Sequence, residues 1–142
     1  MSYYLSRTVD AAFDEVVQRV TAALKEEGFG VLTDIDVQAT LKSKLGADVP
    51  PYRILGACNP SFAHQALQIE DKLGVLLPCN VIVRDAGDEQ TEVAAIDPVA
   101  SMDRTGNPEL AEYVTPKVVP YTAGEAGAGK SIVWLARAAL TM

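Results

Sequence analysis

The sequence predicts an α+β domain of two layers, a mostly antiparallel sheet with helices packed on one face. Segments with strand-like alternation are interleaved with amphipathic helical segments, and the last two strand segments flank a glycine-containing turn, as in a hairpin. The alternative is a doubly wound parallel sheet. The second strand segment lacks the continuous apolar run that burial on both faces of such a sheet requires, so we favour the antiparallel arrangement.

A first strand is expected at residues 3–9, and it leads into the clearest helix of the chain. Asp10 stands at the expected N-cap position, and Gly28 lies just past the expected end. The apolar residues of this helix recur at spacings of three and four, so they share one face. They are Phe13, Val16, Val17, Val20 and Leu24.

A second strand at residues 29–35 is followed by a shorter helix. Asp36 is expected to cap this helix, because its carboxylate can accept from the first free backbone N–H groups, and Gly46 is expected to end it. The helix has one row of apolar residues at spacings of four. They are Val37, Leu41 and Leu45.

The third strand is expected at residues 52–58, with Asn59 and Pro60 at the N-cap and first position of the next helix. A fourth strand is expected at residues 75–84, where Pro78 marks an edge or bulge because proline cannot donate to the ladder. A fifth strand at residues 90–96 would complete the hairpin, and Asn107, Pro108 and Glu109 open a further helix that reaches Val114.

Length and charge limit the class of protein. A chain of 142 residues fits one domain, and a net charge of −7 without a basic cluster excludes the electrostatic footprint of a nucleic-acid partner. The sequence has no apolar run long enough for a membrane span and no secretory signal, so we expect the reducing cytoplasm.

Two similar corners are the strongest candidates for a site. The segments GACNP at residues 56–60 and LPCN at residues 77–80 each place a cysteine before an asparagine at a strand end. If the two strands are neighbours, both corners can border one hollow that takes a small ligand. The candidate ligand-binding residues are Cys58, Asn59, Pro60, His64, Pro78, Cys79 and Asn80.

The two cysteines have three interpretations. The simplest is that both are core residues, since free cysteine is among the most buried residue types. The second is a thiol-dependent redox or sulfur-transfer enzyme, because Cys58 precedes a helix start, which favours the thiolate. A metal site is disfavoured, because only Cys58, Cys79 and His64 are near in sequence and a structural zinc needs four ligands. The simplest interpretation of His64 is a surface residue.

Other motifs carry less weight. The chain has one histidine and no G-x-S-x-G nucleophile elbow, so the sequence does not indicate a Ser/His/Asp triad. Capping and turn formation account for Asp34, Asp36 and Asp97. Residues 124–131 match the phosphate-binding loop pattern, but only eleven residues follow Ser131, too few for the sheet and the acidic residue that a nucleotide site needs downstream.

The chain resembles the prokaryotic family called domain of unknown function 302 over residues 3–110. The resemblance rests on ordered segments: EGFGV at 27–31, DVQATLK at 36–42, GACNP at 56–60, LPCNV at 77–81 and AIDP at 95–98. It implies a compact α+β domain, usually a small cytoplasmic protein, that tends to form homodimers. It implies no established activity, and it leaves any cofactor unknown.

The C-terminal part departs from the family pattern. We expect one domain at residues 1–112 and a variant segment at residues 113–142, because Pro116, Pro120 and a glycine-rich stretch interrupt the helix with which relatives finish. The functional hypothesis is a homodimer that binds a small molecule. The alternatives are the thiol enzyme described above and a domain that only dimerises.

Overall fold

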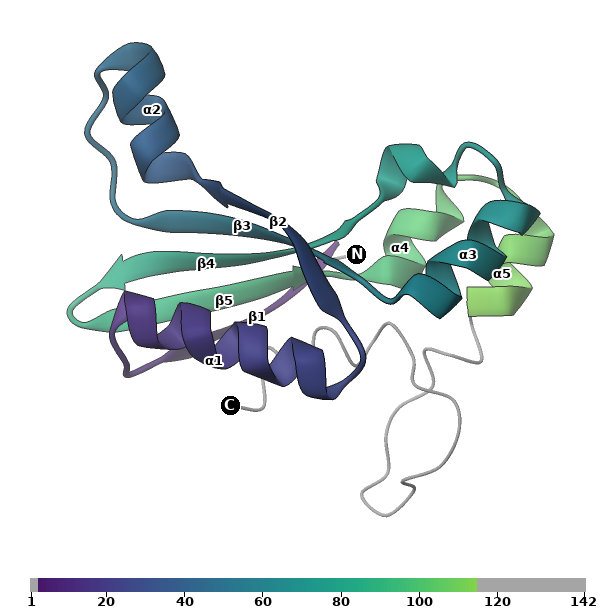
Figure 1. Ribbon diagram of the computed structural model, residues 1–142, viewed down its shortest axis with the longest axis horizontal. Coiled ribbons are helices and arrows are strands. Elements are labelled where there is room, and N and C mark those ends of the chain that lie inside the picture. Colours follow the sequence, from purple (N-terminus) through teal and green to yellow (C-terminus); the bar gives the residue numbers. More distant parts are fainter. Residues whose placement is uncertain (1–2, 115–142) are drawn as a thin grey trace.

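A computed structural model describes residues 3–114 of the chain. Five strands form one sheet in the order β1-β5-β4-β3-β2, with every neighbouring pair antiparallel (Figure 1). The strands are β1 (Tyr4–Val9), β2 (Gly30–Asp36), β3 (Tyr52–Cys58), β4 (Cys79–Gly87) and β5 (Gln90–Ile96). The helices are α1 (Phe13–Glu26), α2 (Val37–Leu45), α3 (Pro60–Ile69), the 3₁₀ helix η1 (Leu73–Leu76), α4 (Pro98–Asp103) and α5 (Pro108–Val114). The α+β prediction is confirmed.

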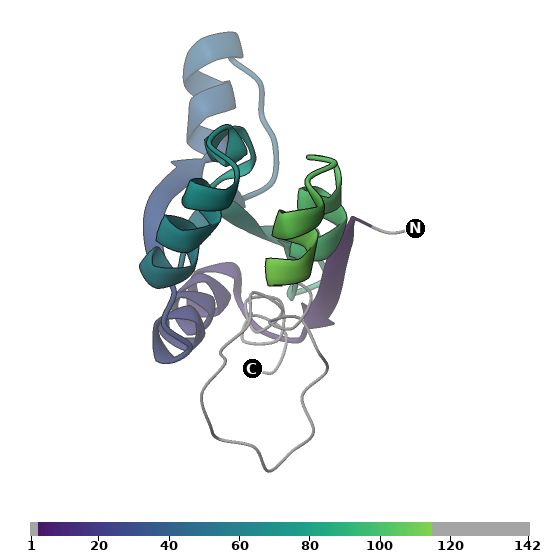
Figure 2. The same ribbon diagram turned by 90° about the vertical axis from the view of Figure 1, so that its right-hand side faces the viewer.

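One face of the sheet carries the core. The apolar stripe of α1 packs on it through Val16, Val20 and Leu24, none of which is exposed. Figures 1 and 2 show α1 along the lower side of the sheet, and α3, α4 and α5 grouped at the sheet end where β3 leaves and β4 enters. The sheet side of this core is formed by Leu55, Ala57, Cys79, Val81, Val83, Val93 and Ala95.

The opposite face of the sheet, called the open face here, is covered by no helix within residues 3–114. The strand registers set its residues in rows, and the middle row runs from Ser6 through Ala94, Ile82 and Ile54 to Ile35. Helix α2 rises on this side and projects from the sheet (Figures 1 and 2). Although Val37, Leu41 and Leu45 form a row as predicted, no residue of α2 is buried.

The local end signals of α2 and α3 were predicted correctly. Asp36 accepts from the Ala39 N–H at 2.9 Å, and Gly46 ends α2 with a left-handed φ of 68°. Asn59 accepts from the Phe62 N–H at 3.3 Å, and Pro60 is the first residue of α3.

Two predicted boundaries are wrong. Helix α1 begins at Phe13 rather than after Asp10, whose carboxylate instead accepts from the Gln90 side chain at 2.8 Å and links β1 to β5. The fourth strand begins at Cys79 rather than at residue 75. A turn of 3₁₀ helix and the cis peptide before Pro78 precede it, and the ladder starts only past Pro78, which has no N–H to donate.

The acidic residues have two different roles. Asp97 caps α4, a helix the sequence did not predict, by accepting from the Val99 N–H at 3.0 Å. Asp34 neither caps nor turns the chain, contrary to prediction. Its carboxylate accepts from Arg53 Nε at 2.7 Å and from a second guanidinium nitrogen, and these hydrogen bonds lower the pKa of Asp34 below its usual range.

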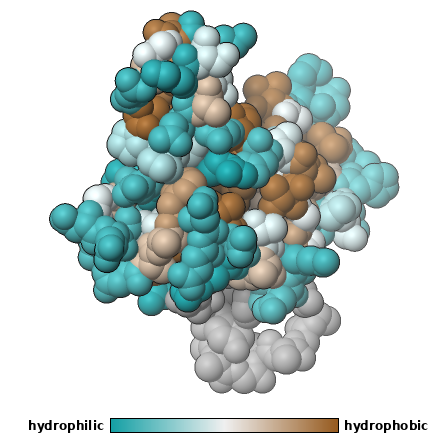
Figure 3. Space-filling model, turned by 60° about the vertical axis from the view of Figure 1, so that its left-hand side comes forward, coloured by the Kyte–Doolittle hydropathy of each residue, from teal (hydrophilic) through white to brown (hydrophobic). Residues whose placement is uncertain are grey.

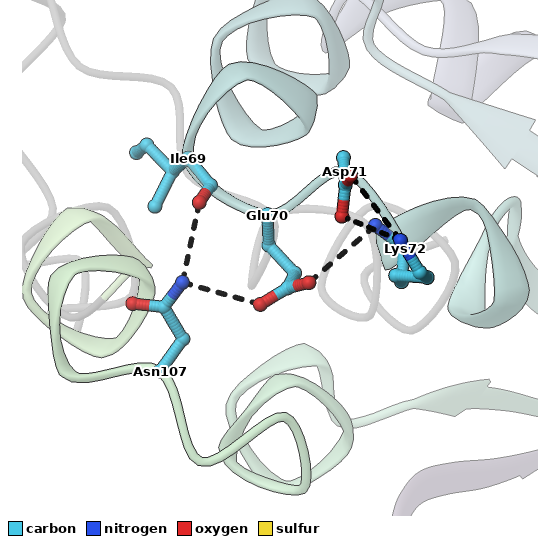
Figure 4. A network of polar contacts seen from close by, with 5 residues as sticks. All are labelled: Ile69, Glu70, Asp71, Lys72 and Asn107. Atoms are coloured by element: carbon cyan, nitrogen blue, oxygen red, sulfur yellow. Dashed lines mark hydrogen bonds and ion pairs between the residues drawn. The ribbon is translucent and has the colours of Figure 1, made fainter.

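Asn107 ties α5 to the end of α3 (Figure 4). Its amide nitrogen donates to the Ile69 carbonyl and to the Glu70 carboxylate, each at 3.2 Å. Its amide oxygen accepts from the Glu109 and Leu110 N–H groups at 3.0 and 3.3 Å, which caps α5. One side chain thus fixes two elements of the helical group.

Replacing Asn107 with alanine is expected to lower the free energy of unfolding by about 1 to 2 kcal/mol, because both the cap and the link to Glu70 are lost. Asn107→Asp keeps the cap oxygen but faces Glu70 with a like charge, so it should not restore stability. Urea unfolding monitored by circular dichroism measures both changes. An alanine variant as stable as the parent would contradict the role given to Asn107.

Candidate functional site

A hollow of about 400 Å³ lies on the open face. We call it the open-face hollow. Its floor is low because Ala94, a small residue, occupies the middle row beside Ile82, while larger side chains stand around it. Its lining residues are Tyr3, Tyr4, Tyr52, Asn80, Ile82, Glu92, Ala94, Ala95 and Ile96.

The tyrosines enter the hollow from different strands. Tyr4 lies opposite Ile96 on the edge strand β1, and its ring meets the ring of Tyr3 edge to face with centroids 5.1 Å apart. Tyr52, at the start of β3, lies opposite Arg84. The order β1-β5-β4-β3 therefore sets Tyr3 and Tyr4 at one side of the hollow and Tyr52 at the other.

Glu92 is the one charged side chain that lines the hollow, and its neighbour Arg84 neutralises it. Glu92 accepts from Arg84 Nε at 2.7 Å across the β4–β5 ladder. This hydrogen bond raises the pKa of Arg84 above its ordinary value, so the guanidinium stays charged. The ion pair leaves the hollow without net charge from these two residues.

The two predicted corners are neighbours, but their residues face different ways. Strands β3 and β4 pair so that Cys79 lies opposite Ala57, one position from Cys58. Cys79 is in the core on the α1 side, whereas Cys58 shares the open-face alternation of β3 with Ile54. Both cysteines are free.

The remaining predicted residues are dispersed. Asn59 caps α3, Pro60 is exposed in its first turn, and His64 is exposed and accepts from the Gln68 amide at 3.1 Å. Pro78 lies against Gly56. Asn80 points to the open face, and of the seven predicted ligand-binding residues it is the one that lines the open-face hollow.

The environment of the thiols opposes the thiolate expected from the helix start. Burial raises the pKa of Cys58, and burial together with the neighbouring Cys58 raises the pKa of Cys79 to about 11. A nucleophilic cysteine needs the opposite shift. Within residues 3–114, no three or more His, Cys, Asp and Glu residues are grouped as metal ligands, and no helix is long and apolar enough to cross a membrane.

The Cys79 thiol predicts a pH dependence of stability. The unfolded thiol ionises near its ordinary pKa of 9.0, while the folded thiol stays protonated up to about 11, so unfolding becomes easier as pH rises through this window. Chemical unfolding measures the free energy of unfolding at pH 8 and at pH 10.5. The decrease between these two pH values should be smaller in Cys79→Ala than in the parent, by on the order of 2 kcal/mol. Equal losses in both proteins would contradict the assigned burial of the thiol.

The hollow was missed at the sequence level because its walls come from strands far apart in the chain. The sequence shows which residues share a face within each strand: residues 4, 6 and 8 in β1, and residues 92, 94 and 96 in β5. No local pattern indicated that β1 pairs with β5. The available signal was that Ala94 stands between the larger Glu92 and Ile96 among the residues of β5 that share its face.

Comparison with known proteins identifies a family and a similar solved structure. The family model described as domain of unknown function DUF302 matches residues 5–119. The crystal structure of an uncharacterized conserved DUF302 protein from Bacillus stearothermophilus is similar, with 30% identity, a TM-score of 0.72, and coverage of 80% of this chain and 88% of that one. No curated protein matches. Residues 124–131, which match the phosphate-binding loop pattern, lie outside the described residues.

Proposed function

The chain belongs to the domain of unknown function DUF302 family, and on that premise we propose that it is a homodimeric protein that binds a small ligand in the open-face hollow. The observation that carries the proposal is the hollow itself: a concave site of about 400 Å³ with an apolar floor, aromatic walls and a few polar groups. Sites of this size and lining are typical of small-molecule binding. Two free cysteines fit the reducing cytoplasm as its compartment.

The dimer is proposed to form through the surface around α2. Isolated helices as short as this nine-residue one are marginal in water, and α2 has no buried residue. Leu32 and Leu45 are 66% and 75% exposed, and Ile35 at the end of the middle row is 47% exposed. Figure 3 shows hydrophobic surface on and beside this projecting helix, which is at the top of that view.

A second copy of the chain is the proposed occupant of this α2 surface. Helix α2 carries Lys42 and Lys44 and no acidic residue, whereas the whole chain has 19 acidic and 12 basic residues. Lys42 is paired with Asp48 at 2.7 Å, so within residues 3–114 Lys44 is the α2 lysine without an ion-pair partner, and it can meet an acidic residue of a second copy. Strand β2 is at the opposite edge of the sheet from β1, so this contact leaves the open-face hollow accessible.

The dimer is tested by sedimentation velocity. The parent chain is expected to be a dimer at micromolar concentration, and Leu45→Lys a monomer, because a charge would be buried in the contact. Val75→Lys is the matched control, since Val75 is 85% exposed on η1, away from α2, and it should remain a dimer. A monomeric parent, or a dimer that persists in Leu45→Lys, would overturn this surface.

Ligand binding is tested with a library of small planar fragments of all charge types, screened by ligand-observed NMR. Hits that bind the parent should lose binding in Ala94→Phe, which fills the hollow from its floor, and keep it in Ala22→Phe, on the exposed side of α1. Asn80→Trp plugs the hollow from an exposed position and serves as a second variant if Ala94→Phe is misfolded. A screen without hits, or hits unaffected by both plugs, would overturn the proposed function.

A further inference from the structure

We propose that the open-face hollow selects an uncharged planar ring that bears a carboxamide or lactam edge. This inference rests on the proposed function, because it names the ligand class of the same hollow. It follows from the shape of the floor, from the aromatic walls, from one free amide and from the balance of charge.

The floor favours a flat, apolar body. Ala94 is only 8% exposed and lies in the middle row next to Ile82, and Ile96 extends the same aliphatic surface. A sheet face presents its side chains at nearly one height, so one alanine between larger residues leaves a shallow depression rather than a deep channel. A planar ring buries more of its surface in such a depression than a globular ligand does.

The walls favour an aromatic ring. Tyr3 and Tyr4 are 69% and 44% exposed and meet edge to face, so both rings present exposed surface at one side of the hollow. Tyr52 stands half-buried at the other side. Aromatic rings gain from stacked or edge-to-face contacts beyond the area that they bury.

Asn80 supplies the polar recognition. Its side chain is exposed, lines the hollow, and makes no hydrogen bond to any other residue of the described part of the chain. A side-chain amide offers a donor and an acceptor side by side. A carboxamide or lactam has the complementary pair on one edge, so the two amides can form two parallel hydrogen bonds.

The charge balance favours a neutral ligand. Glu92 is the one Asp, Glu, Lys, Arg or His side chain among the lining residues, and Arg84 already neutralises it. An anionic ligand would find no free cation in the hollow and would approach a chain of net charge −7. A cationic ligand would have to compete with Arg84 for Glu92.

Three probes of nearly equal shape separate the charge types: nicotinamide is neutral, nicotinate is an anion, and 3-(aminomethyl)pyridine is a cation near pH 7. Affinities are measured by titration of the ¹⁵N-labelled parent chain and its variants. Nicotinamide is expected to bind at least ten-fold tighter than either charged probe. Asn80→Asp removes the donor and should weaken nicotinamide about ten-fold, whereas Gln18→Glu, the same amide-to-acid change on the exposed side of α1, should leave its affinity unchanged.

Three results overturn the inference. A charged probe that binds as tightly as nicotinamide, or an Asn80→Asp variant with parental affinity for it, rules out the neutral carboxamide class while fragment binding in the hollow stands. If none of the three probes binds, this ligand class is also excluded, and the separate fragment screen then decides whether the hollow binds anything.

Discussion

Replacing Leu24 with alanine is expected to lower the free energy of unfolding by about 3 kcal/mol, within the range for fully buried leucines. Leu24 is completely buried where the last turn of α1 meets the sheet, in the same cluster as Leu55 and Val81. Truncation removes apolar surface from the core and leaves a cavity that the sheet cannot close, because its strands are held by their ladders. Urea unfolding measures the loss.

The matched control is Leu67→Ala, the same change at a leucine of α3 that is 39% exposed. It is expected to cost about 1 kcal/mol or less, since less surface returns to water and no closed cavity forms. Equal losses for Leu24→Ala and Leu67→Ala would contradict the placement of the core between α1 and the sheet.

Replacing Gly56 with alanine is expected to destabilise the protein by about 2 to 3 kcal/mol. A Cβ atom at this position would lie 2.1 Å from Thr33 Oγ1 and 2.6 Å from Pro78 Cγ, both closer than van der Waals contact allows. The proline ring cannot rotate away, so β3 and its neighbours have to shift. Because Gly56 pairs with Asn80, this shift would also disturb the edge of the open-face hollow.

A double-mutant cycle and a control test the cause. Thr33→Ala removes the nearer obstacle, so adding it to Gly56→Ala should recover about 1 kcal/mol and leave the clash with Pro78. Gly30→Ala is the control, because a Cβ there meets nothing within 4 Å, and its effect should stay within about 0.5 kcal/mol. A Gly56→Ala variant as stable as Gly30→Ala would show that the close approach does not constrain the sheet.

The parts of the fold that local chemistry determines could be predicted from the sequence. Asp36 and Gly46 bound α2 as expected, because capping and left-handed termination depend on residues within one turn. Asp10 has the same chemistry but is engaged by Gln90, 80 residues away, and so it caps no helix. The exposure of α2 could not be predicted either. A row of apolar residues predicts that a helix face is buried, but it does not identify the element that covers that face.

The candidate site could be predicted only in part, because part of it depends on contacts between residues far apart in the sequence. Asn80 was identified because it stands in a repeated Cys-Asn motif and faces the open side of β4. Its partner in that motif, Cys79, faces the core, since adjacent strand residues point to opposite faces. Tyr4 and Ala94 enter the site only through the pairing of β1 with β5, which no local pattern encodes.

The most direct test of the account is to map where a ligand binds. Backbone amide shifts of the ¹⁵N-labelled chain are recorded with the tightest fragment from the screen. The largest changes are expected at Tyr4, Asn80 and Ala94, on the face opposite α1. Changes centred instead on Asn59 and His64 at the start of α3 would contradict it and would favour the corner that the sequence first suggested.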